Sequence, residues 1–572
     1  MPMRRILPIV SLKDKTMKTF RLLIILCLAI FLFSVPRPVA LVKISKGTPG
    51  LVGILKAHQI DVIQELKTCF LARAERDEMA SLRTYGISVS VLDRDSRGNE
   101  YFLVPSLSPA RLSAVSAAGN LKPVEPNLYL FWTDQGDPLA LLPADVERKH
   151  LPRSSILPFL KTYTRPESVP LGLKLNDMIP AIINQVSRAN LRAYVQGLQD
   201  FQTRYSTTAN CEAAGQFILG FFQSLGLEAG FQPFTIGGIS TRNVVAEIQG
   251  ETDPEDIVII CGHYDSTSGE AEVSAPGADD NASGVAAVME AARILAGYPL
   301  DFTVRFIAFS AEEQGLYGSH YHSAVAREGL ERIIGVVNLD MISYTEDPSE
   351  DLDVIVNDAS WWLAERAGLV ADAYTGLAVR KIVDASFVYS DHSPFWDEGY
   401  PALCGIEDAN PNNPYYHTTG DTVDTLNFDF FEDAARTALA ALSDLAQPVR
   451  VGYPRTPAGL EAESATYASA FTAIKNVNLT WQAVSDAAGY NVYRSTYPHL
   501  GHVKISSSPV STAQFTDRAL EAGTSYYYAV TAVWPGGLES NFSRQVESPA
   551  ETARYEQPES GQEAAPVIWR WR

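Results

Sequence analysis

The stretch Ile257-Val258-Ile259-Ile260-Cys261-Gly262-His263-Tyr264-Asp265 decides the fold, because a continuous apolar run ends directly in a histidine and an aspartate. Such a run is typical of a strand that is buried on both faces, as in a parallel sheet. Residues 302–309 and 335–339 are two further runs of this kind. Residues 283–297 lie between the first two runs and carry apolar residues at helical spacing. This alternation predicts a doubly wound α/β fold with a mostly parallel sheet for residues 171–447.

Side chains that can bind metal follow each predicted strand at its carboxyl end. In chain order they are His263, Asp265, Glu312, Glu313 and Asp340. Because the carboxyl ends of neighbouring parallel strands meet at one edge of a sheet, we expect these side chains to lie close together. Each of them alone has an ordinary explanation, such as a helix cap or a solvated surface charge. Their joint occurrence at one sheet edge favours a shared site.

Two more candidate ligands lie outside the strand ends, namely Asp280 in a loop before the predicted helix and His417 in a late segment. Imidazole and carboxylate groups suit zinc and similar divalent ions. Two such ions need about one bridging carboxylate and two further protein ligands each. That count is met by His263, Asp280, Glu313, Asp340 and His417. Glu312 is left over and can serve as a general base. Without a cation, clustered carboxylates repel each other, so the pattern predicts a two-metal site.

Residues 171–447 resemble the co-catalytic zinc aminopeptidase family that includes the secreted bacterial leucyl aminopeptidases. The motifs that carry the resemblance are Gly262-His263-Tyr264-Asp265-Ser266, Pro276-Gly277-Ala278-Asp279-Asp280-Asn281-Ala282-Ser283-Gly284, Ala311-Glu312-Glu313-Gln314-Gly315, Asn338-Leu339-Asp340-Met341 and His417-Thr418-Thr419. The resemblance implies two Zn²⁺ ions that share Asp280. It implies that His263 and Asp340 complete one metal site and that Glu313 and His417 complete the other.

The resemblance also implies catalytic roles for Glu312, as the general base, and for Asp265, which would hold the imidazole of His263 in its ligating orientation. The implied activity is an exopeptidase that releases N-terminal apolar residues from peptides by metal-activated water attack. Its substrates would be peptides with free N-termini.

The resemblance implies an apolar pocket for the substrate side chain. Its candidate residues are Met341, Cys404, Ile406 and Tyr416. Residues 385–392 resemble a family loop that can carry a disulfide and a transition-state tyrosine, but the expected cysteines are absent. Phe387 stands at the tyrosine position, and Tyr389 is close by. Both belong to the candidate pocket, and the oxyanion donor is left open.

Two other readings compete with the aminopeptidase, namely another enzyme on the same scaffold and a non-catalytic protein. Among such enzymes the glutaminyl cyclases resemble a one-zinc version that lacks the histidine of the His-x-Asp motif, and His263 argues against them. A metallo-carboxypeptidase on the same fold would need a cationic group for the substrate carboxylate, and the sequence does not identify one. A non-catalytic adhesion or receptor protein is conceivable because of the carboxyl-terminal domain. Ser390-Asp391-His392 does not indicate a serine hydrolase, since neighbouring residues of one short loop rarely form a triad. His320 and His322 are expected at the surface rather than at the metal site.

The segments around the α/β domain have different characters. Residues 41–170 mix helix and strand patterns, which predicts a small α+β domain that resembles a propeptide in its position. Residues 455–546 resemble a fibronectin type III domain, a β-sandwich, in which Trp481 and Tyr528 are expected in the core. Residues 547–572 form a polar tail.

The first 40 residues look like an export segment. Lys18 and Arg21 precede an apolar run over residues 22–35, which is shorter than the roughly 20 residues that a membrane span needs. We expect a signal peptide or an uncleaved signal anchor, and therefore an exported protein that is secreted, periplasmic or at the cell surface. Membrane attachment is expected only if the segment stays uncleaved.

Composition narrows the function further. The formal net charge is −21, which argues against nucleic acid as a partner. Five scattered cysteines do not make a disulfide framework, so most are expected to be buried thiols. Oligomeric state cannot be read from these features.

Overall fold

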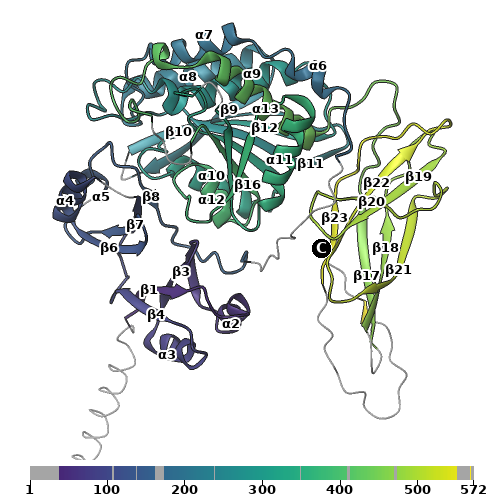
Figure 1. Cartoon of the computed structure of the whole chain (residues 1–572), viewed down its shortest axis with the longest axis horizontal. Helices are drawn as coiled ribbons and strands as arrows, with labels where there is room; N and C mark the ends of the chain where they lie inside the picture. Colours follow the sequence, from purple (N-terminus) through teal and green to yellow (C-terminus); the bar gives the residue numbers. More distant parts are fainter. Residues whose placement is uncertain are drawn as a thin grey trace, which may run out of the picture.

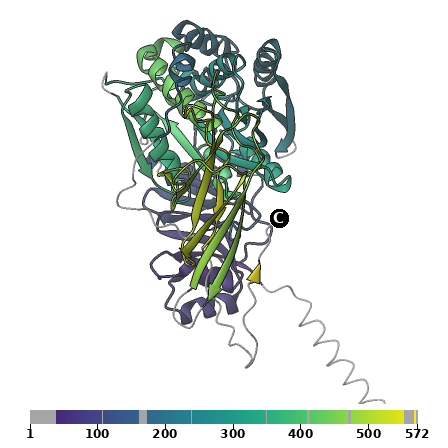
Figure 2. The same ribbon diagram turned by 90° about the vertical axis from the view of Figure 1, so that its right-hand side faces the viewer.

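The computed structural model describes residues 38–105, 108–136, 138–160, 173–236, 239–347, 350–408, 413–468, 473–550 and 567–568. Figure 1 shows an α/β domain flanked by a small amino-terminal domain on one side and a β-sandwich on the other. In Figure 2 the sandwich lies in front of the amino-terminal domain. The expected export segment lies outside the described residues, apart from residues 38–40. None of the described helices is long and apolar enough to cross a membrane.

The amino-terminal domain contains two four-stranded sheets. The first has the order β2-β3-β1-β4, and the second has the order β6-β7-β5-β8. The strands are β1 (Ala40–Ser45), β2 (Asp61–Glu65), β3 (Cys69–Ala74), β4 (Val89–Asp93), β5 (Phe102–Pro105), β6 (Asn120–Glu125), β7 (Leu128–Trp132) and β8 (Lys149–His150). The helices are α2 (Leu51–Ala57), α3 (Arg76–Thr84), α4 (Pro109–Ala118) and α5 (Pro138–Leu141).

The α/β domain is built on one eight-stranded sheet with the order β15-β14-β16-β13-β11-β12-β10-β9. Its strands are β9 (Glu228–Ile236), β10 (Ile239–Ile248), β11 (Asp253–His263), β12 (Phe302–Phe309), β13 (Arg332–Leu339), β14 (Leu352–Val356), β15 (Val379–Val383) and β16 (Ala402–Ile406). The strands β16, β13, β11 and β12 are parallel to their neighbours in this group. The β9–β10 hairpin and the β14–β16 pair are antiparallel. The sheet is therefore mixed, with a parallel centre, rather than mostly parallel throughout.

Both faces of the sheet are covered by helices, which explains the continuous apolar runs of the central strands. Val258 and Ile260 of β11 belong to the large core on one face, whereas Ile257 and Ile259 belong to a smaller core on the other. The large core packs α6 (Ile179–Ile183), α7 (Arg188–Gln199), α8 (Ala209–Ser224), α9 (Gly284–Leu295), α11 (Trp361–Tyr374) and α13 (Phe428–Ala446). The smaller core packs α10 (Tyr317–Glu328) and α12 (His392–Asp397).

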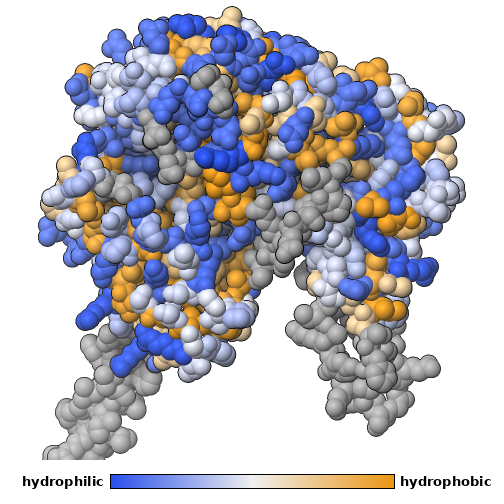
Figure 3. All heavy atoms as spheres, viewed as in Figure 1, coloured by the Kyte–Doolittle hydropathy of each residue, from blue (hydrophilic) through white to orange (hydrophobic). Residues whose placement is uncertain are grey.

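The carboxyl-terminal domain is a β-sandwich of two antiparallel four-stranded sheets, with the orders β21-β18-β17-β24 and β20-β19-β22-β23. Its strands are β17 (Glu461–Ala468), β18 (Ala473–Thr480), β19 (Gly489–Ser495), β20 (Val503–Lys504), β21 (Gln514–Glu521), β22 (Tyr526–Val533), β23 (Val546–Ser548) and β24 (Val567–Ile568). Trp481 and Tyr528 are buried in its core. On the face drawn in Figure 3, hydrophobic and hydrophilic residues are interspersed over all three domains.

Candidate metal centre

Three neighbouring parallel strands deliver the first group of site residues. His263 is the last residue of β11, Glu312 and Glu313 follow β12, and Asp340 follows β13. β11 pairs with β12 on one side and with β13 on the other. The three strands therefore end side by side, and the side chains beyond them converge at one edge of the sheet.

The loop that carries Asp280 is held by side chains from distant parts of the chain. The carboxylate of Asp421 accepts hydrogen bonds from the backbone amides of Asp279 (2.9 Å) and Asp280 (3.0 Å). The fully buried guanidinium of Arg204 donates to the carbonyls of Pro276 and Gly277. These bonds satisfy the polar groups of a buried loop and fix the direction of Asp280.

Asp280 lies between the two imidazoles. Its Oδ1 is 3.3 Å from Nε2 of His263, and its Oδ2 is 3.1 Å from Nε2 of His417. Nε2 of His263 is also 3.3 Å from Oδ1 of Asp340, and Nε2 of His417 is 3.1 Å from Oε2 of Glu313. Each imidazole thus faces the shared carboxylate and one carboxylate of its own.

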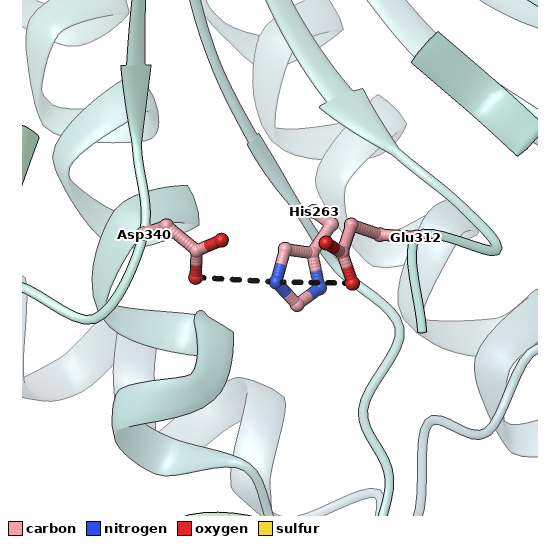
Figure 4. A group of neighbouring side chains, drawn as sticks. All are labelled: His263, Glu312 and Asp340. Carbon is pink, nitrogen blue, oxygen red and sulfur yellow. Dashed lines mark hydrogen bonds and ion pairs between the residues drawn. The ribbon is translucent and has the colours of Figure 1, made fainter. Parts of the chain in front are cut away.

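Glu312 lies beside this group, with Oε2 3.9 Å from Nε2 of His263. Figure 4 shows His263 between the carboxylates of Glu312 and Asp340. Asp265 supports both sides of the arrangement. Its carboxylate accepts the backbone amides of Glu312 (3.2 Å) and Glu313 (3.3 Å). Its main-chain carbonyl lies 3.1 Å from Nδ1 of His263, closer than its carboxylate at 3.8 Å.

The buried charges of the cluster shift one another's pKa values. Burial alone would lower the pKa of His263, but Glu312 and Asp340 outweigh it and raise this pKa well above its usual value. The pKa of His417 is likewise raised, because Glu313 and Asp280 outweigh burial. Burial, and then the charge of Asp340, raises the pKa of Glu312 well above its usual value. The cluster therefore holds more carboxylates than its two imidazoles can neutralise.

The donor set fits divalent metal. His263, Glu312 and Asp340 present ligand atoms within 4.8 Å of one another, and so do His263, Asp280 and Glu313. Oε1 of Glu313 is buried and has no hydrogen-bond partner among the described residues. An unpaired carboxylate oxygen in a buried site is costly unless a cation meets it. Nitrogen and oxygen donors in this combination suit zinc.

A cavity of about 1020 Å³ opens above the cluster. Of the expected pocket residues, Met341, Phe387, Tyr389, Ile406 and Tyr416 line it. Cys404 does not line it. Its thiol is buried in the same apolar cluster as Met341 and Ile406, and it accepts a hydrogen bond from Asn338. The four described cysteines are free, buried thiols, as the sequence indicates.

Sequence reasoning missed several lining residues. Ile355 and Ile382 come from neighbouring strands and extend the apolar wall. Glu147 comes from the amino-terminal domain, and Tyr416 Oη donates to it at 3.1 Å. Burial raises the pKa of Glu147 to about 8. The expected surface position of His322 is wrong, since its side chain is 3 % exposed beneath the sheet.

The sequence and the fold are both similar to those of known proteins. Residues 243–442 match the sequence model of Peptidase family M28. The chain is 27% identical over 352 residues to a probable zinc metalloprotease of Pyricularia oryzae, an alignment that covers 49% of this chain and 70% of that protein. It is 25% identical over 300 residues to a probable leucine aminopeptidase of Trichophyton verrucosum, with 50% and 81% covered. The crystal structure of LapB from Legionella pneumophila shares the fold, with a TM-score of 0.50 and 21% identity over 61% of this chain and 100% of that one.

Proposed function

We propose that this zinc-dependent exopeptidase is an aminopeptidase that releases apolar residues, one at a time, from the free N-termini of peptides. The match to Peptidase family M28 and the relatives named zinc metalloprotease and leucine aminopeptidase support the enzyme class. The convergence of imidazoles, carboxylates and Glu312 below one cavity supports a catalytic rather than a purely adhesive role.

The cations around the cavity help to decide whether the enzyme cleaves from the N-terminus or from the C-terminus of a peptide. Among the described lining residues, Arg148, Arg380 and Lys381 are the arginines and lysines. Arg380 is paired with Asp353, and Lys381 with Glu365. Arg148 donates to backbone carbonyls of its own segment. A carboxypeptidase needs a cation for the terminal carboxylate of its substrate, and each of these three is already engaged. This observation favours the aminopeptidase.

The metal site in this proposal holds two zinc ions. His263 and Asp340 would hold one, His417 and Glu313 the other, and the carboxylate of Asp280 would be shared. Bound zinc supplies Lewis acidity, which polarises the scissile carbonyl and lowers the pKa of the attacking water. Glu312 takes the proton of that water and passes it to the leaving amine. Asp265 keeps Glu312 in place through the backbone amides that it accepts.

The apolar preference follows from the wall of the cavity beside Asp340. Met341 and Ile406 are buried there, with Phe387 and Tyr416 packed against them. A branched or unbranched aliphatic side chain buried against this wall gains about 25 cal/mol for each Å² removed from water. A charged side chain would lose hydration there without gaining a partner.

The proposal also includes export of the protein and the identity of the carboxyl-terminal domain. The charged residues before an apolar run in the first 40 residues support export. The two packed antiparallel sheets and the Gly489-Tyr490-Asn491-Val492-Tyr493-Arg494 motif support a fibronectin type III identity for the sandwich. The net charge of −21 supports peptides rather than nucleic acid as partners.

The test is hydrolysis of aminoacyl 4-nitroanilides and of the same compounds with an acetylated amine. Chelated enzyme, zinc-restored enzyme and the variant Glu312→Gln are compared. We expect zinc-dependent release from free amines only, fastest with leucine, and a fall in kcat of roughly 10²–10⁴-fold in Glu312→Gln. Release from blocked amines, or from C-terminal residues alone, would overturn the proposal. A zinc-loaded enzyme with no activity on either class would favour the adhesion alternative.

A further inference from the structure

The amino-terminal domain forms part of the wall of the cavity above the metal centre. Its contribution consists of Pro105, Glu125, Pro126, Asn127, Leu128, Glu147 and Arg148. The remaining lining residues come from the α/β domain. The cavity is therefore built jointly, and a substrate in it would touch both domains.

The segment that leads into β8 contacts the metal centre itself. The carbonyl of Asp145 lies 3.2 Å from Nδ1 of His417, the imidazole nitrogen that faces away from Asp280. The carbonyl of Ala144 accepts a hydrogen bond from the hydroxyl of Thr267 at 3.1 Å. A hydrogen bond to the second nitrogen of a ligating imidazole fixes the orientation of the ring. The amino-terminal domain thus orients one candidate ligand.

The same domain holds the loop that carries Phe387 and Tyr389. The hydroxyl of Ser386 donates to Glu125 and accepts the backbone amide of Lys67 at 2.7 Å. Val388 is fully buried in a hydrophobic cluster whose other buried members belong to the amino-terminal domain. The loop, which lacks the expected cysteines, is held by packing against this domain.

Glu147 is the acidic side chain that this arrangement brings into the cavity beside His417. It is only partly buried, and its carboxylate receives one hydrogen bond from the described residues, from the hydroxyl of Tyr416. No lysine or arginine of the described residues pairs with it, whereas the other lining glutamate of this domain, Glu125, is bonded to Thr68 and Ser386. Burial raises the pKa of Glu147 in the free enzyme, and an ammonium group beside it would favour the carboxylate form, whose spare acceptor capacity suits that cation.

We propose that Glu147 binds the free ammonium group of the substrate, and that the amino-terminal domain is a permanent part of the active enzyme rather than a removable propeptide. The assignment rests on the proposed aminopeptidase function. Glu147 positions the first residue of the peptide so that its scissile carbonyl lies over the metal centre. A peptide with a blocked amine has no charge for Glu147 to bind, and burying the carboxylate against it is unfavourable.

The test compares Glu147→Gln with Glu100→Gln in the full chain. Glu100 belongs to the same domain, pairs with Arg153 and does not line the cavity. For leucine 4-nitroanilide we expect Glu147→Gln to raise KM by about 10–100-fold while kcat changes by less than about threefold. Glu147→Asp should recover part of the loss, and Glu100→Gln should match the wild type. Zinc content, measured by mass spectrometry, should be equal in all four proteins.

A second experiment measures binding of the amine through inhibition rather than through KM. Competitive inhibition by 3-methylbutan-1-amine and by 3-methylbutan-1-ol compares a charged with an uncharged ligand of the same shape. We expect Glu147→Gln to weaken inhibition by the amine and to leave inhibition by the alcohol unchanged. Equal weakening of both inhibitors, or an unchanged KM, would overturn the assignment.

Mass spectrometry of the intact, active protein shows whether the amino-terminal domain is still attached. We expect active enzyme to retain the amino-terminal domain, and activity that appears only after its removal would overturn the proposal. A wild-type enzyme that hydrolyses no free-amine substrate would instead contradict the proposed function. The two failures are therefore distinguishable.

Discussion

Asp280 is the residue that both halves of the proposed two-zinc centre would share. Its two oxygens are divided between His263 and His417, at 3.3 Å and 3.1 Å. His417, in contrast, pairs with Asp280 and Glu313 and with neither Asp340 nor Glu312 among the described ion pairs. Removing Asp280 should therefore cost the protein more zinc ions than removing His417 does. The two variants should differ in metal content as well as in activity.

We expect Asp280→Ala to bind well below one zinc ion per chain, whereas His417→Ala should retain about one. The reason is that a bridging carboxylate contributes to the affinity of both ions, but a terminal imidazole contributes to one. Metal per chain is measured by mass spectrometry after dialysis against a fixed free zinc concentration. Equal zinc contents in the two variants would contradict the shared role of Asp280.

His322 is a buried histidine outside the metal centre whose pKa is lowered by its surroundings. Its Nδ1 lies 3.0 Å from Gln232 Oε1, and its Nε2 lies 3.3 Å from the guanidinium of Arg305. Burial, and then the charge of Arg305, lowers the pKa of His322 to about 3. The neutral ring satisfies both partners, whereas a proton on Nε2 would face a cation.

This depressed pKa predicts that the free energy of unfolding decreases as the pH is lowered. An unfolded histidine titrates near 6.5, so below that value the unfolded chain binds a proton that the folded chain refuses. Between pH 6.5 and pH 4.5 the loss amounts to about 2–3 kcal/mol for this one group. We expect the thermal midpoint of His322→Gln to fall less over this range than that of the wild type. Loss of zinc at low pH affects both proteins, so parallel declines would show that His322 plays no part.

At the residue scale, the sequence is informative where a side chain follows a strand end. His263, Glu313 and Asp340 could be grouped because parallel strands share an edge. Glu147 could not, because it lies far from them in the chain and enters the cavity through the packing of another domain. Cys404 was expected in the pocket wall, but an apolar residue of a central strand can face either the cavity or the core behind it, and no sequence pattern separates the two.

At the scale of elements, the loop from Gly277 to Gly284 depends on close backbone approaches. A Cβ at Gly284, the first residue of α9, would lie 2.4 Å from the carbonyl of Leu339 at the end of β13. Gly297 lies just beyond the other end of the same helix, where a Cβ would meet its nearest neighbour at 3.5 Å. The two glycines therefore offer a matched pair of substitutions.

We expect Gly284→Ala to push the start of α9 away from β13 and so to displace Asp280 relative to Asp340. The overlap with backbone cannot be relieved by a rotamer change, and we expect a cost of roughly 1–3 kcal/mol together with reduced zinc affinity. Gly297→Ala should be neutral or slightly stabilising. Thermal midpoints and zinc titrations of both variants check this. A Gly284→Ala protein with wild-type zinc affinity would show that the loop tolerates the shift.

The elements also show why the sheet was only partly predictable. A continuous apolar run shows that both faces of a strand are buried, and the central strands have that property. It carries no information on strand direction, which depends on the length and path of the connections. β9 ends at Ile236 and β10 begins at Ile239, a separation too short for a parallel crossover, and the two strands are antiparallel. β14 runs opposite to β16, and a sequence pattern alone does not reveal this.

At the scale of the whole molecule, the amino-terminal and α/β domains are joined by a buried ion pair. Lys149 of β8 lies 2.7 Å from Asp397 of α12, and the two side chains are 0% and 4% exposed. Burial lowers the pKa of Lys149 and raises that of Asp397, so each charge depends on the other to remain buried. Removal of the amino-terminal domain would take Lys149 away and leave Asp397 without its partner. The pair therefore predicts that the two domains unfold together.

We expect calorimetry of the wild type to show these two domains in one transition, and Lys149→Met to lower its midpoint and separate the domains into two transitions. Leaving Asp397 buried without its partner costs about 3–5 kcal/mol. The double variant Lys149→Met/Asp397→Leu should recover most of that loss, because the uncompensated charge is gone. Arg153→Met, which removes an exposed partner of Glu100, should cost less than about 1 kcal/mol. If Lys149→Met behaves like Arg153→Met, apolar packing such as that around Val388 holds the two domains together without the ion pair.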